Sequence, residues 1–79
     1  MIEQKKIVMT VLVFKTNIRF KKDVAKVATC LQRDKGINRW NVDLEDIDKV
    51  LRVETNSLTA KGIINSIKRC GYECDELPG

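Results

Sequence analysis

The sequence predicts a ferredoxin-like α+β sandwich, with the element order strand, helix, strand, strand, helix, strand. Three observations predict it: two stretches whose apolar residues recur every three or four positions, runs of β-forming residues on either side of them, and an acidic turn between the two middle strands. Right-handed crossovers and a hairpin between the middle strands then give a four-stranded antiparallel sheet. Its strand order is 4-1-3-2, and two helices cover one face.

The first strand and the first helix are predicted over residues 6–15 and 19–34. Ile7 to Phe14 is a run of β-formers, which is typical of a central strand. The apolar residues of the helix share one face: Phe20, Val24, Val27 and Leu31. Gly36 stands where a helix of this length ends.

The second half of the chain predicts a hairpin, a helix and a short strand. Residues 37–44 alternate apolar and polar side chains, residues 45–48 form an acidic turn, and residues 50–54 return as a strand. The second helix has three candidate capping residues: Asn56, Ser57 and Thr59. Its inner face consists of Ala60, Ile63, Ile64 and Ile67. Gly71 suits a left-handed residue at the end of this helix, and residues 72–77 supply the last strand.

Length and composition indicate one small globular domain over residues 1–79. The chain is 43% hydrophobic and 33% charged, which excludes a disordered protein. No apolar run approaches the roughly 20 residues that cross a bilayer, so no membrane association is expected. An odd number of cysteines, three, does not suggest a disulfide framework, and we expect a reducing, cytoplasmic environment.

Charge is distributed unevenly along the chain. Residues 1–39 contain ten Lys or Arg and three acids, a net charge of +7, whereas residues 40–79 contain five and eight, a net charge of −3. The acidic half argues against a surface that coats nucleic acid. The chain also has only four aromatic residues and lacks the basic, aromatic strand of RNA-binding domains that share this element order. Nucleic acid is therefore not expected as a partner.

Three segments resemble heavy-metal-associated domains, the family of metallochaperones and copper-pump N-terminal domains. They are Val24–Leu31, Trp40–Glu45 and Ile63–Glu73, and the last contains the recognisable Gly-Tyr-Glu ending. The similarity extends over nearly the whole chain. In that family a Met-X-Cys-X-X-Cys loop after the first strand holds the metal. Alignment on the first helix places Asn17 and Phe20 at the two cysteine positions.

These replacements remove the usual metal ligands of the family. A neutral amide is a poor ligand for cuprous ion, and a phenyl ring is none. Zinc would also lack its usual donors, because the chain has no histidine. We therefore expect no metal at residues 16–20 and no cofactor. Asn17 is predicted to cap the first helix, and Phe20 is predicted to pack in the core.

The cysteines allow two interpretations. Cys70 and Cys74 are predicted to lie near the end of the domain where a family member holds its metal, and together could form a soft-metal site or a disulfide. The favoured interpretation is that Cys30, Cys70 and Cys74 are packing residues, since free cysteine behaves as a small buried hydrophobe.

A group of cations is expected around the start of the first helix. Arg19, Lys21 and Lys22 occupy its first turn, where the helix dipole favours acids, and Lys68 and Arg69 are expected near the same end. Such a group could hold an anion or contact an acidic partner. Solvated charges, screened by the acidic turn at residues 45–48, are the favoured alternative.

The first strand is apolar on both faces, although only one face of the sheet is covered by helices. The predicted outward residues form a possible interface: Val8, Leu12, Phe14 and, from the neighbouring strand, Val50. The equally weighted alternative is that the aliphatic stems of Arg39, Arg52 and Glu54 cover this face.

No enzyme is expected, because the chain lacks histidine, a serine with a plausible base and a carboxylate pair on a cleft wall. The sequence thus predicts a cytoplasmic, non-catalytic domain with a metallochaperone scaffold but without its metal loop. It would act through a protein partner or as a weak homodimer. The alternative is a divergent copper or zinc binder that uses Cys70 and Cys74.

Overall fold

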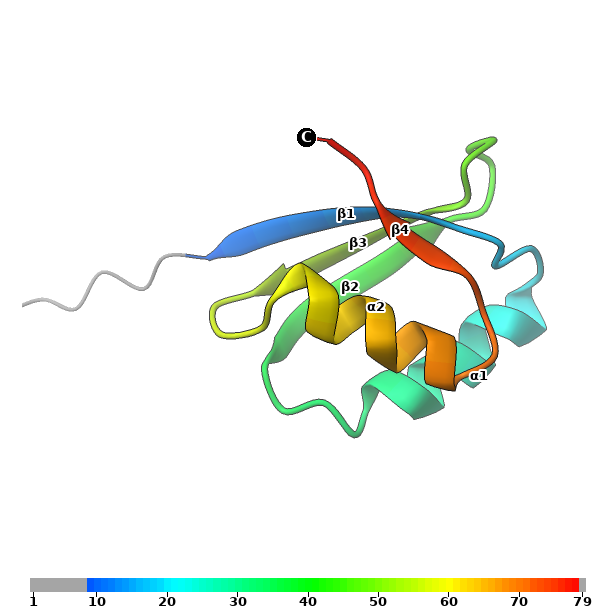
Figure 1. Cartoon of the computed structure of the whole chain (residues 1–79). Coiled ribbons are helices and arrows are strands. Elements are labelled where there is room, and N and C mark those ends of the chain that lie inside the picture. The colour runs from blue at the N-terminus through cyan, green and yellow to red at the C-terminus, as the bar shows by residue number, and fades with distance from the viewer. Residues whose placement is uncertain (1–8, 79) are drawn as a thin grey trace, which may run out of the picture.

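The computed structural model describes residues 9–78, which form a two-layer α+β sandwich (Figure 1). Its elements follow in the predicted order: β1 (Thr10–Thr16), α1 (Lys21–Leu31), β2 (Ile37–Asp43), β3 (Val50–Thr55), α2 (Ala60–Arg69) and β4 (Cys74–Glu76). The sheet order β2-β3-β1-β4 is the predicted order read from the other edge, and all three strand pairs are antiparallel. Both helices lie on one face of the sheet.

The core lies between this sheet and the helices. Its fully buried aliphatic and aromatic side chains come from β1, the loop after it, β3 and both helices: Phe14, Ile18, Val27, Leu51, Val53, Ile63 and Ile67. Leu12, Trp40 and Val42 pack against this group from β1 and β2. Burial of each of these side chains contributes roughly 1.5–3 kcal/mol to the free energy of folding. This burial is the main stabilisation available to so small a domain.

The structure contradicts the predicted orientation of β1. Phe14 is fully buried and stands opposite Leu51, and Leu12 stands opposite the buried Val53. Because side chains alternate across a strand, Val11 and Val13 face away from the helices. They stand opposite Glu54 and Arg52. The predicted interface was therefore wrong for Leu12 and Phe14.

Helix α1 begins later than predicted and uses a different cap. Its N-cap is Phe20, in an extended conformation without a capping side chain of its own. The carboxylate of Asp23 instead reaches back and accepts a hydrogen bond from the Phe20 backbone N–H, with the oxygen 3.0 Å from the nitrogen. Ile18 enters the core, so the expectation that Phe20 is buried was wrong.

Helix α2 follows the predicted capping scheme. The Thr59 hydroxyl accepts a hydrogen bond from the Gly62 backbone N–H at 3.1 Å, the usual arrangement of an N-cap threonine. At the other end of the helix, Gly71 has φ of +98°, a backbone conformation that residues other than glycine rarely adopt. The chain can therefore turn sharply from α2 into β4.

The connection from α1 to β2 and the connection from β3 to α2 touch one another. Both lie at the end of the domain remote from the β2–β3 hairpin. A side chain at Gly36 would place its Cβ 2.6 Å from Oγ of Ser57 and 2.9 Å from Cγ of Leu58. The buried Thr55 hydroxyl joins the two connections, because it donates to the Gly36 carbonyl and accepts from the backbone N–H groups of Ser57 and Leu58. Only glycine fits at position 36 without a local shift.

Within residues 9–78, no helix is both long and apolar enough to cross a membrane. Val8, one of the predicted interface residues, lies outside the described residues.

Candidate functional site

The loop from β1 to α1 is held against the β2–β3 hairpin by Thr16. The Thr16 backbone N–H donates to the Asp48 carbonyl at 3.0 Å, and its hydroxyl donates to the Lys49 carbonyl. The same hydroxyl accepts from the Ile18 backbone N–H at 3.2 Å. Thr16 is itself buried, so these bonds are shielded from water. The loop is therefore anchored at the last residue of β1.

Asn17 anchors the next position to the corner before β4. Its side-chain oxygen accepts a hydrogen bond from the Glu73 backbone N–H, 2.9 Å away. The prediction that Asn17 caps α1 was wrong, because the N-cap of the helix is Phe20, three residues later. The amide is occupied in joining two loops that are distant in sequence.

An exposed apolar pair lies beside this anchor. Phe20 is 59% exposed and Ile47, in the β2–β3 turn, is 93% exposed. Both line a shallow hollow together with Thr16, Asn17, Arg19 and Lys49. We call Asn17, Arg19, Phe20, Ile47 and Lys49 the loop-end surface. Lys22 adds a further cation, with its ammonium 5.6 Å from the centre of the Phe20 ring.

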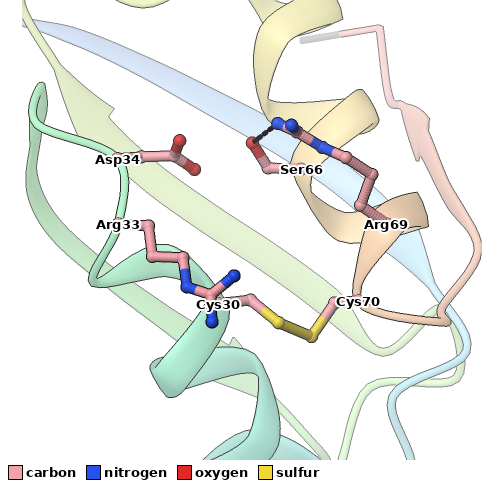
Figure 2. Close-up of a pocket in the computed structure, with 6 residues that line it drawn as sticks. All are labelled: Cys30, Arg33, Asp34, Ser66, Arg69 and Cys70. Carbon is pink, nitrogen blue, oxygen red and sulfur yellow. Dashed lines mark hydrogen bonds between the residues drawn. A yellow bond between two sulfur atoms is a disulfide. The ribbon is translucent and has the colours of Figure 1, made fainter.

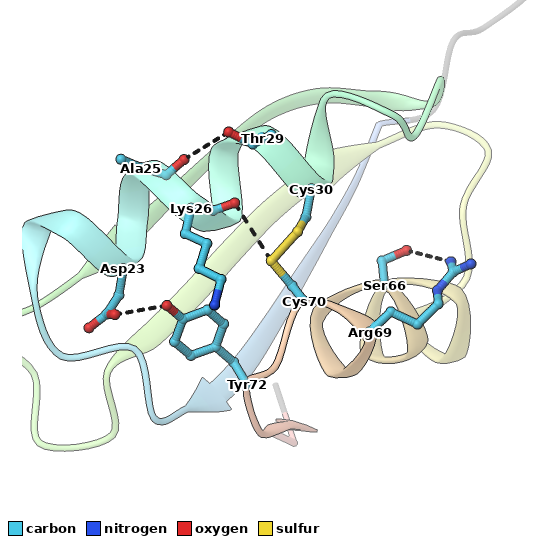
Figure 3. The surroundings of a disulfide bond; sticks show 9 residues. All are labelled: Asp23, Ala25, Lys26, Thr29, Cys30, Ser66, Arg69, Cys70 and Tyr72. Atoms are coloured by element: carbon cyan, nitrogen blue, oxygen red, sulfur yellow. Dashed lines mark hydrogen bonds between the residues drawn. A yellow bond between two sulfur atoms is a disulfide. The ribbon is translucent and has the colours of Figure 1, made fainter.

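Tyr72 supports the start of α1 from the neighbouring corner. Its hydroxyl donates to Oδ1 of Asp23 at 2.8 Å, and the ammonium of Lys26 lies 5.6 Å from its ring centre (Figure 3). The hydrogen bond from Tyr72 is the largest influence on Asp23, and it holds the pKa of that carboxyl below its usual 3.8. The same bond raises the pKa of Tyr72. Asp23 therefore remains ionised and continues to cap α1.

The cysteines form a pair that the sequence interpretation did not anticipate. Cys30, in α1, and Cys70, which caps the end of α2, are joined by a disulfide with their Cα atoms 6.1 Å apart (Figure 3). The odd cysteine count therefore did not exclude a disulfide. The proposed pairing of Cys70 with Cys74 was wrong, because the sulfur of Cys70 is bonded to Cys30.

The interpretation that the cysteines are free packing residues fits Cys74 alone, because Cys30 and Cys70 are bonded to each other. Cys70 and Cys74 are buried, at 7% and 1% exposure, whereas Cys30 is only half-buried. Burial is the main cause that raises the pKa of the free Cys74 thiol to about 12. A protonated, buried thiol is a poor metal ligand. In residues 9–78, no three side chains of the histidine, cysteine, aspartate or glutamate type are grouped so that they could hold a metal ion.

A second hollow, of about 280 Å³, lies over the disulfide between the ends of the two helices (Figure 2). Its lining consists of Cys30, Arg33, Asp34, Ser66, Arg69 and Cys70. An Arg69 nitrogen is held 3.4 Å from the Ser66 hydroxyl oxygen, to which it donates. We call this hollow the disulfide hollow.

The predicted group of five cations does not form one site. Arg19 lines the loop-end hollow, while Arg69 lines the disulfide hollow with Arg33. Lys68 and Arg69 also line a shallow depression with Asn65. The acidic turn was expected to screen the cations at the start of α1, but its Asp48 pairs with Lys15 at 3.8 Å.

The face of the sheet away from the helices is mixed in character. Met9 and Val11 are 47% and 49% exposed. Arg39 and Glu54 form an ion pair across β2 and β3, with Nε of Arg39 3.5 Å from the carboxylate. Val50, which was predicted to face outward, is half-buried and stands opposite Asp43 on this face.

Several solved structures share this arrangement. The copper(I)-loaded first domain of the human copper chaperone for SOD1, CCS, superposes with a TM-score of 0.75 and 22% identity, over 87% of this chain and 93% of that one. The N-terminal domain of PacS from Synechocystis PCC6803 gives 0.74 and 13%, over 87% and 98%. Oxidized MerP from Ralstonia metallidurans CH34 gives 0.77 and 9%, over 90% and 100%.

This chain has the heavy-metal-associated domain fold. The resemblance found in the sequence is thereby confirmed at the level of architecture. No family model and no curated protein matches the chain, so the likeness rests on structure.

Proposed function

We propose that this chain is a non-catalytic interaction domain, which uses the heavy-metal-associated fold to bind a protein through its loop-end surface. The observation that carries the proposal is the exposure of Phe20. This residue stands where the resemblance places a metal-binding cysteine, and it presents 59% of its surface to solvent beside Ile47 at 93%. Large apolar side chains that project from a domain are the usual anchors of protein interfaces.

The position of Phe20 on the helix supports this role. An N-cap is favoured by Ser, Thr, Asp or Asn, whose side chains accept a backbone hydrogen bond, and phenylalanine supplies none. An exposed phenyl ring at this position therefore adds little to the stability of the free domain. Residues that break a local rule without a structural gain occur most often at functional sites.

Charge around the pair indicates the chemistry of the partner. Arg19 and Lys49 line the same hollow as Phe20 and Ile47, and the ammonium of Lys22 lies over the Phe20 ring. An apolar patch with acidic groups at its rim would complement this surface. The apolar pair would supply most of the binding energy, and the cations would speed association and select the partner.

The base of the surface is fixed before binding. Thr16 is bonded to the Asp48 and Lys49 backbone, and Asn17 is bonded to Glu73. A loop that is already ordered loses little entropy when a partner docks on it.

Metal binding has less support in this chain. The loop offers one amide, already bonded to Glu73, and no thiolate. The alternative with Cys70 and Cys74 would require the disulfide to be reduced and a buried thiol with a pKa of about 12 to ionise. Nor does the loop-end surface contain a nucleophile paired with a base, which is why we propose a non-catalytic role.

A weak homodimer through the open face of the sheet is a second form of partner binding. Its support is the exposure of Met9 and Val11 at 47% and 49%. Sedimentation over a concentration series would detect such a dimer. A Val11→Lys variant should abolish it, whereas Phe20→Ser should leave it unchanged.

Capture of partners by the immobilised chain tests the main proposal. A protein retained by the wild type should be lost with Phe20→Ser and Ile47→Ser. Val11→Ser is the matched control, since it removes a similarly exposed apolar side chain on the other face. If the retained protein binds Phe20→Ser and Ile47→Ser as well as the wild type, the loop-end surface is not the interface.

A metal titration tests the proposal that residues 16–20 bind no metal ion. With all three cysteines replaced by alanine, the chain should bind neither cuprous ion nor zinc with submicromolar affinity. Such binding in the triple variant would show that residues 16–20 hold a metal. The expected cytoplasmic location stays a prediction, to be tested by fractionating the source cells.

A further inference from the structure

The Cys30–Cys70 disulfide forms part of the lining of an open hollow rather than being sealed in the core. The hollow over it has a volume of about 280 Å³, comparable to the space that a small organic molecule occupies. Cys30 is half-buried and Cys70 is 7% exposed, so the two sulfur-bearing residues differ in their access to solvent. A nucleophile that enters this hollow reaches a disulfide whose Cys30 side is the more open.

Two arginine side chains share the hollow with the disulfide, and that of Arg69 is directed toward Ser66 (Figure 2). Arg33 follows α1 and Arg69 ends α2, and both are exposed side chains that line the hollow (Figure 2). Ion pairs among residues 9–78 are confined to Lys15–Asp48 and Arg39–Glu54, so neither arginine is neutralised by a carboxylate at contact distance. Asp34 also lines the hollow, which leaves a net charge of +1 there.

We propose that the disulfide hollow is a thiol–disulfide exchange site for a small thiol that carries carboxylate groups, the class to which glutathione belongs. Arg33 and Arg69 would hold the carboxylates, because a planar guanidinium donates in a geometry that matches a carboxylate. The bound thiolate would then face the Cys30–Cys70 bond.

Exchange begins with attack on the sulfur of the more exposed residue, Cys30. The incoming thiolate attacks Sγ of Cys30 and forms a mixed disulfide, while the Cys30–Cys70 bond breaks and its electron pair leaves on Sγ of Cys70. Cys70 caps the C-terminal end of α2, where the helix dipole disfavours an anion, so its thiolate takes a proton from solvent. A second small thiolate then attacks the sulfur that the first small thiol contributed to the mixed disulfide. This step releases the symmetrical disulfide of the two small thiols and leaves Cys30 reduced. The reverse sequence, from the small disulfide, reoxidises the pair.

The surroundings of Cys70 suit the released thiol. Its Sγ lies 3.6 Å from the Lys26 carbonyl oxygen (Figure 3). A disulfide sulfur carries no proton, so this contact becomes an S–H···O hydrogen bond only after reduction. Access to solvent, rather than the stability of the leaving thiolate, selects Cys30 as the carrier of the mixed disulfide. The Lys26 carbonyl then stabilises Cys70 once its thiolate has taken up a proton.

Cys74 does not compete in this exchange. It is 1% exposed, and its burial keeps the thiol protonated at neutral pH. Thiolate, rather than thiol, is the reactive form. The native protein therefore contains an internal control, one cysteine that should acquire no small thiol.

The test compares an anionic and a neutral thiol on the oxidised protein. Glutathione and 2-mercaptoethanol are each added at fixed thiolate concentration, the reaction is quenched by alkylation, and mass spectrometry measures the opened fraction over time. The Arg33→Gln/Arg69→Gln variant should react with glutathione about tenfold more slowly than the wild type at low salt, since two partly screened charges are lost. Its rate with 2-mercaptoethanol should stay within about twofold, because no carboxylate needs a partner.

Controls separate this effect from a general loss of charge. Arg39→Gln/Arg52→Gln removes two cations from the opposite face of the sheet and should leave both rates unchanged. Peptide mapping of the first product should find glutathione on Cys30 and none on Cys74. The Phe20→Ser variant should exchange at the wild-type rate. The experiment therefore tests the exchange site independently of the proposed loop-end interface.

Three results would overturn the proposal. The first is an equal slowing of glutathione and 2-mercaptoethanol in the Arg33→Gln/Arg69→Gln variant. The second is a first product with glutathione on Cys70. The third is a reduced protein that forms no Cys30–Cys70 bond in the presence of oxidised glutathione.

Discussion

The hydroxyl of Tyr72 donates a hydrogen bond to Oδ1 of Asp23 at 2.8 Å, between residues 49 positions apart in the chain. The other oxygen of the same carboxylate accepts from the Phe20 backbone N–H at 3.0 Å. One side chain thus caps α1 and joins the start of that helix to the corner that follows α2. The loop-end surface depends on this corner, because Phe20 is the residue that Asp23 caps.

The free energy of unfolding at low pH should show the contribution of the Asp23 carboxylate. Its pKa is lowered in the folded state, so its contribution to stability is complete above the unfolded value and is lost as the pH falls through the folded value, below 3.8. Tyr72→Phe should lower the free energy of unfolding at pH 7, and its difference from the wild type should shrink once Asp23 is protonated. Urea unfolding across pH measures both. Asp75→Asn, an exposed acid on β4, is the matched control and should show no such pattern.

Phe20→Ser should stabilise the free domain. Serine at this extended N-cap can accept a backbone hydrogen bond that phenylalanine cannot, a gain of about 0.5–1 kcal/mol. The phenyl ring is mostly exposed, so its loss opens no cavity. Thermal or urea unfolding measures the gain, with Ile47→Ser as a control that should change stability little. A large loss of stability in Phe20→Ser would show that the ring supports the fold rather than a partner.

Lysine substitutions on β1 distinguish its two faces. Leu12→Lys should destabilise the fold by about 3 kcal/mol or more, because it places a charge against the core that contains Val53. Val11→Lys, the adjacent residue, should change the free energy of unfolding by less than about 1 kcal/mol, since its side chain is 49% exposed. Denaturant unfolding of the two variants compares them directly. The reverse ranking would mean that β1 is turned the other way.

Cys74 should make the fold sensitive to alkali. Burial raises its pKa from 9.0 to about 12, so the folded state favours the neutral thiol. The resulting stability is complete below the unfolded pKa and declines as the pH rises from about 9 toward 12. Cys74→Ala should lower stability at pH 7, because it leaves a small cavity, but its stability should fall less steeply above pH 9. Parallel declines in both proteins would assign the alkaline loss to other groups, of which Tyr72 is one.

The sequence supports the order of the elements better than their faces. The topology could be predicted because the helical and strand periodicities alternate clearly, and Thr59 and Gly71 mark the ends of α2. The orientation of β1 could not be read from that strand alone, because both of its faces are apolar. The neighbouring strand contained the missing signal, since Leu51 and Val53 alternate with Arg52 and Glu54 and oppose Phe14 and Leu12.

The candidate sites needed the structure for a different reason. The start of α1 was placed too early because Asn17 is a good capping residue in general, whereas Asp23 caps from inside the helix and allows Ile18 to enter the core. Cys30 and Cys70 are 40 positions apart, on helices whose contact no local pattern shows. The exposure of Phe20 and Ile47 likewise depends on two loops that meet only in the fold.

The tight contact at Gly36 lies at the end of the domain remote from Phe20 and Ile47. At that end, the crossing connections are fixed by Thr55 and leave no room for a side chain at position 36. A side chain there would require Ser57 or Leu58 to move. At the loop end, the side chains of Phe20 and Ile47 can be exchanged without disturbing the core, because most of their surface already faces water. Substitutions at the loop end would therefore alter the proposed interface while the fold persists, whereas a substitution at position 36 would disturb the packing of the two connections.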